Sequence, residues 1–186
     1  LRVRRPLVLL QSEGKRMPMT WGLSRPVILL PEEATAWPEE RLRAVLLHEL
    51  SHVQRCDCLT QVLAYVARAL HWFNPLIWLA CRRLRDESEQ ACDDTVLGRG
   101  IDAVEYASHL VAVARHVITA DRGWASAPAI ANASTLERRV AAMLHSSRNR
   151  EPLTSTARVL TAAAVLAVIV PLAAATLTGR VGAGTG

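Results

Sequence analysis

A pair of histidines four residues apart constrains this chain more than any other feature of its sequence. His48 and His52 lie within residues 41–53, where apolar side chains recur with the period of a packed helix. On a helix, this spacing places both imidazoles on one face, one turn apart, so that they can hold one metal ion from the same side. Pro38 suits the first position of this helix. The alternative is a core helix in which the two histidines are incidental.

Glu49 directly follows the first histidine, which angles its carboxylate toward a water on the metal rather than toward the metal itself. The resulting His-Glu-x-x-His pattern is typical of zinc peptidases, in which zinc lowers the pKa of a water and the glutamate takes the proton. The sequence therefore predicts a zinc endopeptidase with Zn2+ as cofactor and Glu49 as catalytic base. The candidates for a second donor to the developing oxyanion are His109, His116 and Tyr106.

A catalytic zinc site needs a third protein ligand, which must come from elsewhere in the chain. Glu89 is the best candidate, because it lies on a separate predicted helix, from residue 75 to about residue 97. Asp93, one turn later on the same face, is then expected to accept the free N–H of a ligating histidine and fix its tautomer. Both acids could instead belong to a solvated face. The fallback ligands are Cys58, Asp57 and His71.

Charge and cysteine usage narrow the partners and the compartment. The 186 residues carry a formal net charge of +5, and Lys15 is the only lysine. Because the arginines are scattered among acidic residues, with no basic run interleaved with aromatics, we expect no direct contact with nucleic acid. The four cysteines lack Cys-x-x-Cys spacing, and we expect them to be reduced, buried thiols.

Residues 1–31 predict a small antiparallel β region. Apolar runs at residues 6–11 and 25–30 flank a turn, and the stretch around Pro18 is expected to be an edge strand. An edge strand beside the metal helix could pair with an extended peptide substrate, and a plain packing hairpin is the alternative. Since most of the remaining chain predicts helices, the expected fold class is α+β, mainly α.

The apolar stretch at residues 59–81 is interrupted by Arg68, His71 and the pair Asn74-Pro75. Two packed helices fit it better than one membrane span, with Asn74 as N-cap and Pro75 as first residue of the second helix. The aromatic cluster of this stretch could still dip toward a bilayer surface.

Further helices are expected from residue 102 to about residue 119 and from residue 134 to about residue 145. Between them, residues 120–133 show no clear period and predict an exposed loop, a candidate segment for self-cleavage or regulation.

The last part of the chain predicts a transmembrane helix. Residues 159–178 carry no charge, and more arginines precede them than follow, which places the metal domain in the cytoplasm. A buried soluble helix is the alternative. We expect a zinc metallopeptidase domain at residues 1–150, and a linker with this helix at residues 151–186. The chain should be a piece of a longer multi-pass protein of the cell membrane.

Five motifs occur in one order along residues 1–145. They are Pro18-Met-Thr-x-Gly22, Arg25-Pro-Val-Ile-Leu-Leu-Pro31, His48-Glu-Leu-Ser-His52-x-x-Arg55-x-Asp57, Phe73-Asn-Pro-Leu-Ile-Trp78 and Glu89-x-x-Cys-Asp93. Together they make the chain resemble the BlaR/MecR family of membrane metallopeptidases. The resemblance implies a zincin-like domain of gluzincin type, inserted in a bundle of membrane helices. It also implies structural roles for Arg55 and Asp57.

By the family motif, His48, His52 and Glu89 carry over as zinc ligands and Glu49 as the base. In antibiotic-sensing members an extracellular domain detects a β-lactam, and the cytoplasmic zinc domain then cleaves itself and brings about loss of a DNA-binding repressor. The implied partners are thus a protein substrate such as a repressor, the lipid bilayer, and membrane helices and a sensor domain beyond this chain.

No sensor domain is present in these 186 residues, so the link to β-lactams is an analogy. The competing functions are a non-enzymatic membrane signalling or scaffold protein and a general membrane-associated quality-control peptidase. A structural zinc site would want four protein ligands and would not need Glu49.

Overall fold

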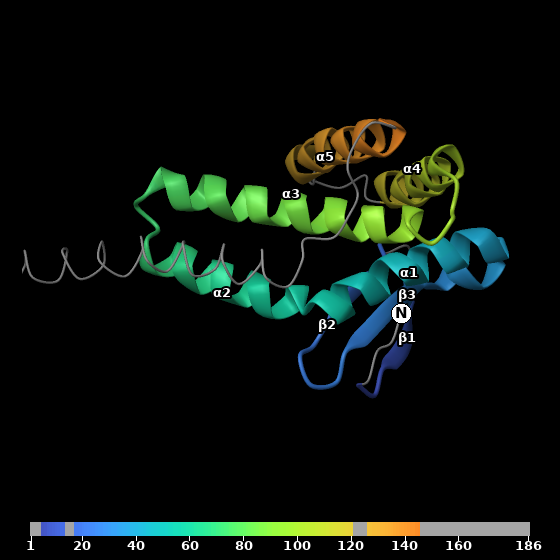
Figure 1. Ribbon diagram of the computed structural model, residues 1–186, viewed down its shortest axis with the longest axis horizontal. Helices are drawn as coiled ribbons and strands as arrows, with labels where there is room; N and C mark the ends of the chain where they lie inside the picture. Colours follow the sequence, from blue (N-terminus) through green and yellow to red (C-terminus); the bar gives the residue numbers. More distant parts are fainter. Residues whose placement is uncertain (1–4, 14–16, 121–125, 146–186) are drawn as a thin grey trace, which may run out of the picture. The chain divides into compact units, whose positions relative to one another are not determined.

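In a computed structural model of the chain, the described residues are 5–13, 17–120 and 126–145 (Figure 1). The chain divides into two compact units, residues 1–148 and 149–186, and all described residues lie in the first. The predicted linker and transmembrane helix therefore lie outside the described residues. Among the residues that are described, none of the helices has the length and apolar character needed to cross a membrane.

A small mixed sheet opens the fold. Its strands are β1 (Val8–Ser12), β2 (Met19–Trp21) and β3 (Val27–Pro31), in the order β1-β3-β2. β2 pairs antiparallel with β3, and Gly22, at φ +92°, makes the tight reversal between them. A Cβ at this position would lie 2.6 Å from the carbonyl oxygen of Arg25, so only glycine fits.

The prediction of an antiparallel region is wrong for the β1–β3 pair, which is parallel. The chain reverses direction between β1 and β2 and again between β2 and β3, so that β3 runs parallel to β1 once it takes the centre of the sheet, where Ile28 and Leu30 are buried. The edge position of β2 was expected, because Pro18 directly precedes it and has no N–H to donate to a neighbouring strand.

In the part of the chain that the structure describes, five α-helices follow a short 3-10 turn over Glu32–Ala36. They are α1 (Glu39–Arg55), α2 (Asp57–Leu70), α3 (Pro75–Leu97), α4 (Ala103–Ala120) and α5 (Ser126–Leu144). The helix predicted around His48 is confirmed, but α1 begins at Glu39 and Pro38 is its N-cap, one residue before the first helical position predicted for it. The two helices expected around Asn74 are confirmed, and its Oδ1 accepts a hydrogen bond from the backbone N–H of Leu76 at 3.0 Å.

The predicted loop at residues 120–133 is wrong for most of its length, because α4 ends at Ala120 and α5 already begins at Ser126. The physical reason is composition: this stretch is rich in alanine, and Pro128 lies in the first turn, where a missing N–H costs no hydrogen bond.

The expectation of four buried thiols is also only partly met. All four cysteines are free, but only Cys92 is buried.

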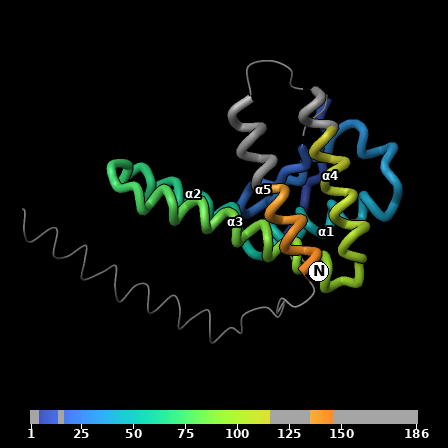
Figure 2. Tube along the Cα trace, turned by 90° about the horizontal axis from the view of Figure 1, so that it is seen from above, coloured from blue at the N-terminus to red at the C-terminus, as the bar shows by residue number. Residues whose placement is uncertain are grey.

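The core lies on both sides of α1. One cluster joins the sheet to α1 and α4, and its buried members are Ile28, Leu30, Ala34, Val45 and Val113. The other joins α1, α3, α4 and α5, and its buried members are Ala44, Val96, Tyr106, Ala107 and Met143. α1 is thus the shared central element. Figures 1 and 2 show α2 and α3 side by side, projecting beyond the other helices.

Replacing Ile28 by Ala should test the first cluster. This side chain is fully buried in the central strand, so its truncation removes apolar burial and leaves a cavity that costs about 2–5 kcal/mol of unfolding free energy. Urea denaturation measures the change. The matched control is Val104→Ala, at an exposed position of α4, where a change within about 0.5 kcal/mol is expected. Equal losses in both variants would contradict the packing described.

Candidate metal centre

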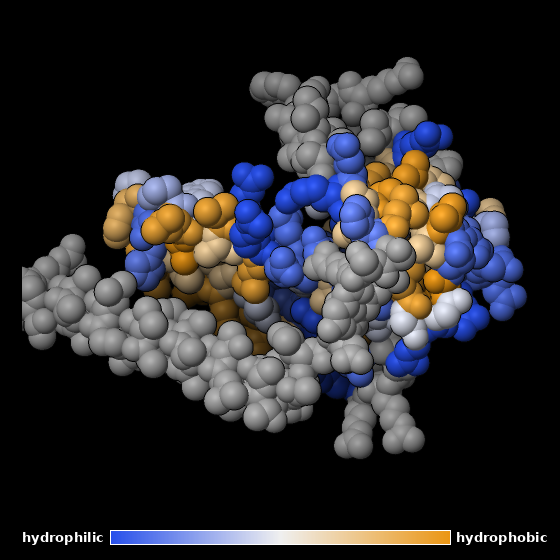
Figure 3. Space-filling view, turned by 45° about the horizontal axis from the view of Figure 1, so that its top comes forward, coloured by the Kyte–Doolittle hydropathy of each residue, from blue (hydrophilic) through white to orange (hydrophobic). Residues whose placement is uncertain are grey.

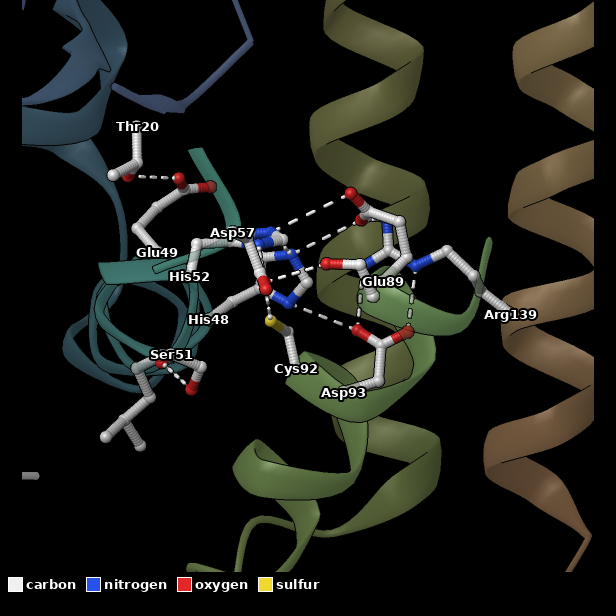
Figure 4. Close-up of polar contacts among 12 residues, drawn as sticks. Thr20, His48, Glu49, Ser51, His52, Asp57, Glu89, Cys92, Asp93 and Arg139 are labelled. Atoms are coloured by element: carbon white, nitrogen blue, oxygen red, sulfur yellow. Dashed lines mark hydrogen bonds and ion pairs between the residues drawn. The ribbon is translucent and has the colours of Figure 1, made fainter. Parts of the chain in front are cut away.

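The predicted site residues come together between two helices. α1 carries His48, Glu49 and His52, and the C-terminal half of α3 carries Glu89 and Asp93 (Figure 4). The spacing of four on each helix places each pair on one face. The histidine pair of α1 faces the acidic pair of α3. One member of each pair, His48 and Asp93, is buried, and so is Glu49.

Donor atoms of three residues converge at distances that suit one small metal ion. Nε2 of His48 lies 3.3 Å from Nε2 of His52. Oε2 of Glu89 lies 3.5 Å from the first of these nitrogens, and Oε1 lies 3.7 Å from the second. Zinc bonds of 2.0–2.2 Å in a tetrahedron would separate ligand atoms by about 3.3–3.6 Å. The three residues therefore fit a zinc ion without rearrangement of the helices.

The far sides of both imidazoles explain why their Nε2 atoms can serve as ligands. Nδ1 of His52 donates to Oδ2 of Asp57 at 2.8 Å, and Nδ1 of His48 faces Oδ1 of Asp93 at 3.2 Å. With the ring protons held on Nδ1, the two Nε2 lone pairs point at each other across 3.3 Å. Two acceptors in that position require a cation between them or a proton on one of them.

Asp57 is a fallback ligand in the sequence interpretation, but in the structure it hydrogen-bonds to the side of the His52 ring that faces away from the proposed metal. Cys56 is the C-cap of α1, and its φ of +59° turns the chain so that Asp57 lies behind the ring of His52. The hydroxyl of Ser88 donates to the same carboxylate at 2.7 Å. The other two fallback ligands are not part of this cluster either. Cys58 lines the cavity onto which the cluster opens, and Nδ1 of His71, just after α2, hydrogen-bonds to the carbonyl of Ala67.

A second cluster with metal-binding spacing uses the opposite side of the same ring, and consists of His52, Asp57 and Cys92. Burial, followed by the charge of Asp57, raises the pKa of the Cys92 thiol far above its usual range. In this cluster the carboxylate of Asp57 already accepts from Nδ1 of His52 at 2.8 Å, so a metal ion there would displace that hydrogen bond. Cys92 instead lies within weak hydrogen-bonding distance of Asp57, at 3.7 Å. The first cluster is therefore the better metal site.

Arg139 of α5 is the main contributor that the sequence interpretation missed. Its Nε and Nη2 donate to the two carboxylate oxygens of Asp93 at 2.8 and 2.7 Å, and Nη1 lies 3.0 Å from Oε2 of Glu89. One guanidinium thus orients both acids (Figure 4). Nothing in the local sequence distinguishes it from Arg138, because only the packing of α5 on α3 reveals which of the two faces the site.

The electrostatics of the centre favour a bound cation. Burial alone would lower the pKa of His48, but hydrogen bonds to Asp93 and Glu89 outweigh burial and raise it to about 9. Burial would raise the pKa of Glu89, yet His48 and Arg139 lower it to about 2. The pKa of Asp93 is held below its usual range, against burial, by Arg139 and His48. Both acids are therefore charged at neutral pH.

Glu49 lies on the other side of the histidine pair, turned toward the sheet (Figure 4). The hydroxyl of Thr20, on the edge strand β2, donates to its Oε2 at 2.6 Å. A cavity of about 620 Å3 is lined by both residues together with His48, His52 and Glu89. The glutamate is therefore fixed at the wall of the same space that the three metal-facing side chains reach.

Two of the three candidates for an oxyanion donor, Tyr106 and His109, are not among the described residues that line this space. Tyr106 is fully buried, and its hydroxyl donates to Oδ1 of Asp93 at 2.8 Å. His109 lies 3.5 Å from Glu105 and is not among the residues that line the cavity. The side chain of His116 lies outside the described residues. Tyr106 thus supports Asp93 and His48, a role that spacing alone does not reveal.

Comparison with known proteins agrees with this geometry. The sequence profile of the family described as BlaR1 peptidase M56 matches residues 1–143. The chain belongs to this family. The resemblance to BlaR/MecR proteins is therefore confirmed, and the family is one of peptidases.

Curated relatives match about half of the chain. It is 34% identical over 97 residues to the regulatory protein BlaR1 of Bacillus licheniformis, which covers 52% of this chain and 16% of that protein. It is 32% identical over 81 residues to the methicillin resistance mecR1 protein of Staphylococcus aureus, which covers 43% of this chain and 14% of that protein. The chain thus spans only a small part of the length of these relatives.

Arg139→Gln should weaken metal binding in a chain that still folds. Removal of a group that orients the residues binding a metal typically costs about 10–100-fold in metal affinity, and we expect this loss for zinc in competition with a chelator. The matched control is Arg138→Gln on the same helix, whose guanidinium pairs with Asp86 at 2.8 Å, away from the centre. Equal affinities in the two variants would contradict the role of Arg139.

The stability of the chelator-treated chain should depend on pH through His48. Because the pKa rises from 6.5 to about 9 on folding, the stabilisation is complete below pH 6.5 and is lost as the pH rises toward 9. The thermal midpoint should fall over this window, and it should fall less in zinc, which replaces the proton. His48→Gln should abolish the effect, and His109→Gln should keep it. A flat midpoint without metal would contradict this assignment.

Proposed function

We propose that this chain is the catalytic domain of a membrane-bound zinc endopeptidase that acts in signalling. The observation that carries the proposal is the convergence of His48, His52 and Glu89 at tetrahedral spacing beside Glu49. Zinc is the proposed ion because two imidazoles and one carboxylate, with a fourth position open, are the donor set of catalytic zinc sites. The proposed fold is zincin-like, of gluzincin type.

The chemistry assigned to the chain's own residues is peptide hydrolysis. Bound zinc supplies a Lewis acid and lowers the pKa of a water. Glu49 accepts the proton of the attacking water and returns it to the nitrogen of the leaving amine. The hydrogen bond from Thr20 holds Oε2 of Glu49, which leaves Oε1 to accept that proton. Asp93 and Asp57 keep the two imidazoles in the tautomer that exposes Nε2.

The edge strand β2 is the proposed substrate-binding element. Met19 and Thr20 of β2 line the cavity, and β2 pairs with β3 along one side only. Its other side can pair with the extended backbone of a peptide, which would bring a scissile bond next to Glu49. This arrangement supports an endopeptidase that binds its substrate as an added strand.

The relatives suggest the biological setting. One is named a regulatory protein and another a methicillin resistance protein. By analogy, we propose that the domain at residues 1–150 lies in the cytoplasm and cleaves itself and a cytoplasmic regulator, such as a transcriptional repressor. The linker and transmembrane helix are proposed at residues 151–186, with the span at residues 159–178. A scaffold role fits less well, because a structural site would not need Glu49.

Glu49→Gln should separate binding from catalysis. Loss of a general base typically costs about 100- to 10,000-fold in rate, so hydrolysis of a protein substrate by the membrane-bound protein should fall by that range while zinc content is unchanged. Glu89→Gln should lose both zinc and hydrolysis, and Glu87→Gln, at an exposed position of α3, should lose neither. Full hydrolysis by Glu49→Gln would overturn the proposed function.

A further inference from the structure

The hairpin of α2 and α3 ends in an apolar tip with no core beneath it. None of residues 69–85 is buried, and the large side chains around the turn are among the most exposed of the described residues. Leu70, Trp72, Phe73 and Leu76 are each 68–70% exposed. Figure 3 shows hydrophobic side chains gathered over this hairpin, away from the hydrophilic residues near the middle of the molecule. Exposed apolar surface of this extent marks an interaction site.

The tip is an ordered structure rather than a frayed end. Nε1 of Trp78 donates to the backbone carbonyl of Trp72 at 2.9 Å, and Asn74 caps α3. The guanidinium of Arg68 lies over the rings of Tyr65 and Trp78, 5.1 and 4.7 Å from their centroids. These contacts hold the aromatic side chains of the tip in place while they stay exposed to solvent.

The charges on the hairpin change sign at a definite point. Residues 58–85 contain four arginines and no aspartate or glutamate, and acidic residues resume at residue 86. Arg82 and Arg83 lie seven and eight residues beyond Pro75, which is about 10–12 Å along a helix. The sequence of an apolar tip, a basic belt and then an acidic region complements a bilayer interface with anionic lipid headgroups.

The dimensions of the apolar part favour insertion into the interface rather than a span. α2 has 14 residues, about 21 Å of helix, whereas the hydrocarbon core of a bilayer is about 30 Å thick. α3 is longer, but it carries charge from Arg82 onward, so its apolar part is shorter still. Arginine side chains about 10 Å from the tip match the depth to which interfacial helices bury their apolar faces, about 5–10 Å.

We propose that residues 70–79 insert into the interface of a bilayer that contains anionic lipids, with Arg82 and Arg83 at the headgroups. The same hairpin walls the cavity, because Val62, Tyr65 and Arg85 are among its lining residues. Insertion would therefore hold the cavity close to the bilayer surface and favour protein substrates that reach it there. This inference does not depend on the proposed zinc chemistry.

Tryptophan quenching by lipids tests the insertion. The 186-residue chain is placed in nanodiscs of phosphatidylglycerol and phosphatidylcholine with brominated acyl chains, and its fluorescence is compared with that in unbrominated nanodiscs. We expect strong quenching in the wild type and loss of most of it in the double variant Trp72→Phe and Trp78→Phe. The control Trp21→Phe, on the edge strand, should leave the quenching unchanged. All these replacements are at exposed positions.

The lipid and charge dependence completes the test. Replacement of Arg82 and Arg83 by Gln, or omission of phosphatidylglycerol, should reduce the quenching that Trp72 and Trp78 contribute. Chelation of zinc should leave this quenching unchanged, so that failure of the metal site is distinguishable from failure of this proposal. If the double tryptophan variant is quenched as much as the wild type, the proposal is overturned. Cross-links from the tip to a second copy, without that quenching, would assign the surface to protein contact and overturn it equally.

Discussion

The buried carboxylate of Asp93 is the interaction on which the rest of this structure depends. It is 3% exposed and lies on α3, where it faces His48 of α1, accepts from Tyr106 of α4 and pairs with Arg139 of α5. A buried charge of this kind is tolerated only when it is paired and fully hydrogen-bonded. One side chain thus joins four helices and orients the imidazole whose other nitrogen faces the proposed metal. Loss of its partner would leave an unpaired charge at a cost of about 3–5 kcal/mol.

α1 performs two tasks because its faces differ. Val45 packs against the sheet, and Ala44 lets the helix approach the second core cluster closely. The histidines and Glu49 lie between these faces, where the sheet side supplies Thr20 and the helical side supplies Glu89. Thr20, which holds the proposed base, and Glu89, the proposed third ligand, therefore reach the cavity from opposite sides of α1. The packing of α1 between the sheet and α3 sets the distance between these two groups. A change in the core around α1 should therefore also change the geometry of the site.

Much of this arrangement could be predicted from local sequence, because local rules determine it. The period of α1, the cap at Asn74 and the edge strand after Pro18 each follow from residue types within one or two turns. The spacing of Glu89 and Asp93 likewise gives their shared face. Arg139 could not be predicted, since its role arises from tertiary packing of α5 and its neighbour Arg138 has the same chemistry. The parallel pairing of β1 depends on which strand is central, and the place of Asp57 depends on one left-handed residue, Cys56.

X-ray absorption at the zinc edge of the zinc-loaded chain tests the central claim most directly. The account predicts a first shell of nitrogen and oxygen only, from His48, His52, Glu89 and a water, at about 2.0–2.2 Å. A scatterer at about 2.3 Å, the distance of a zinc–sulfur bond, would place the metal on the other side of His52 with Cys92 and Asp57. That result would contradict the proposed centre and the mechanism built on it.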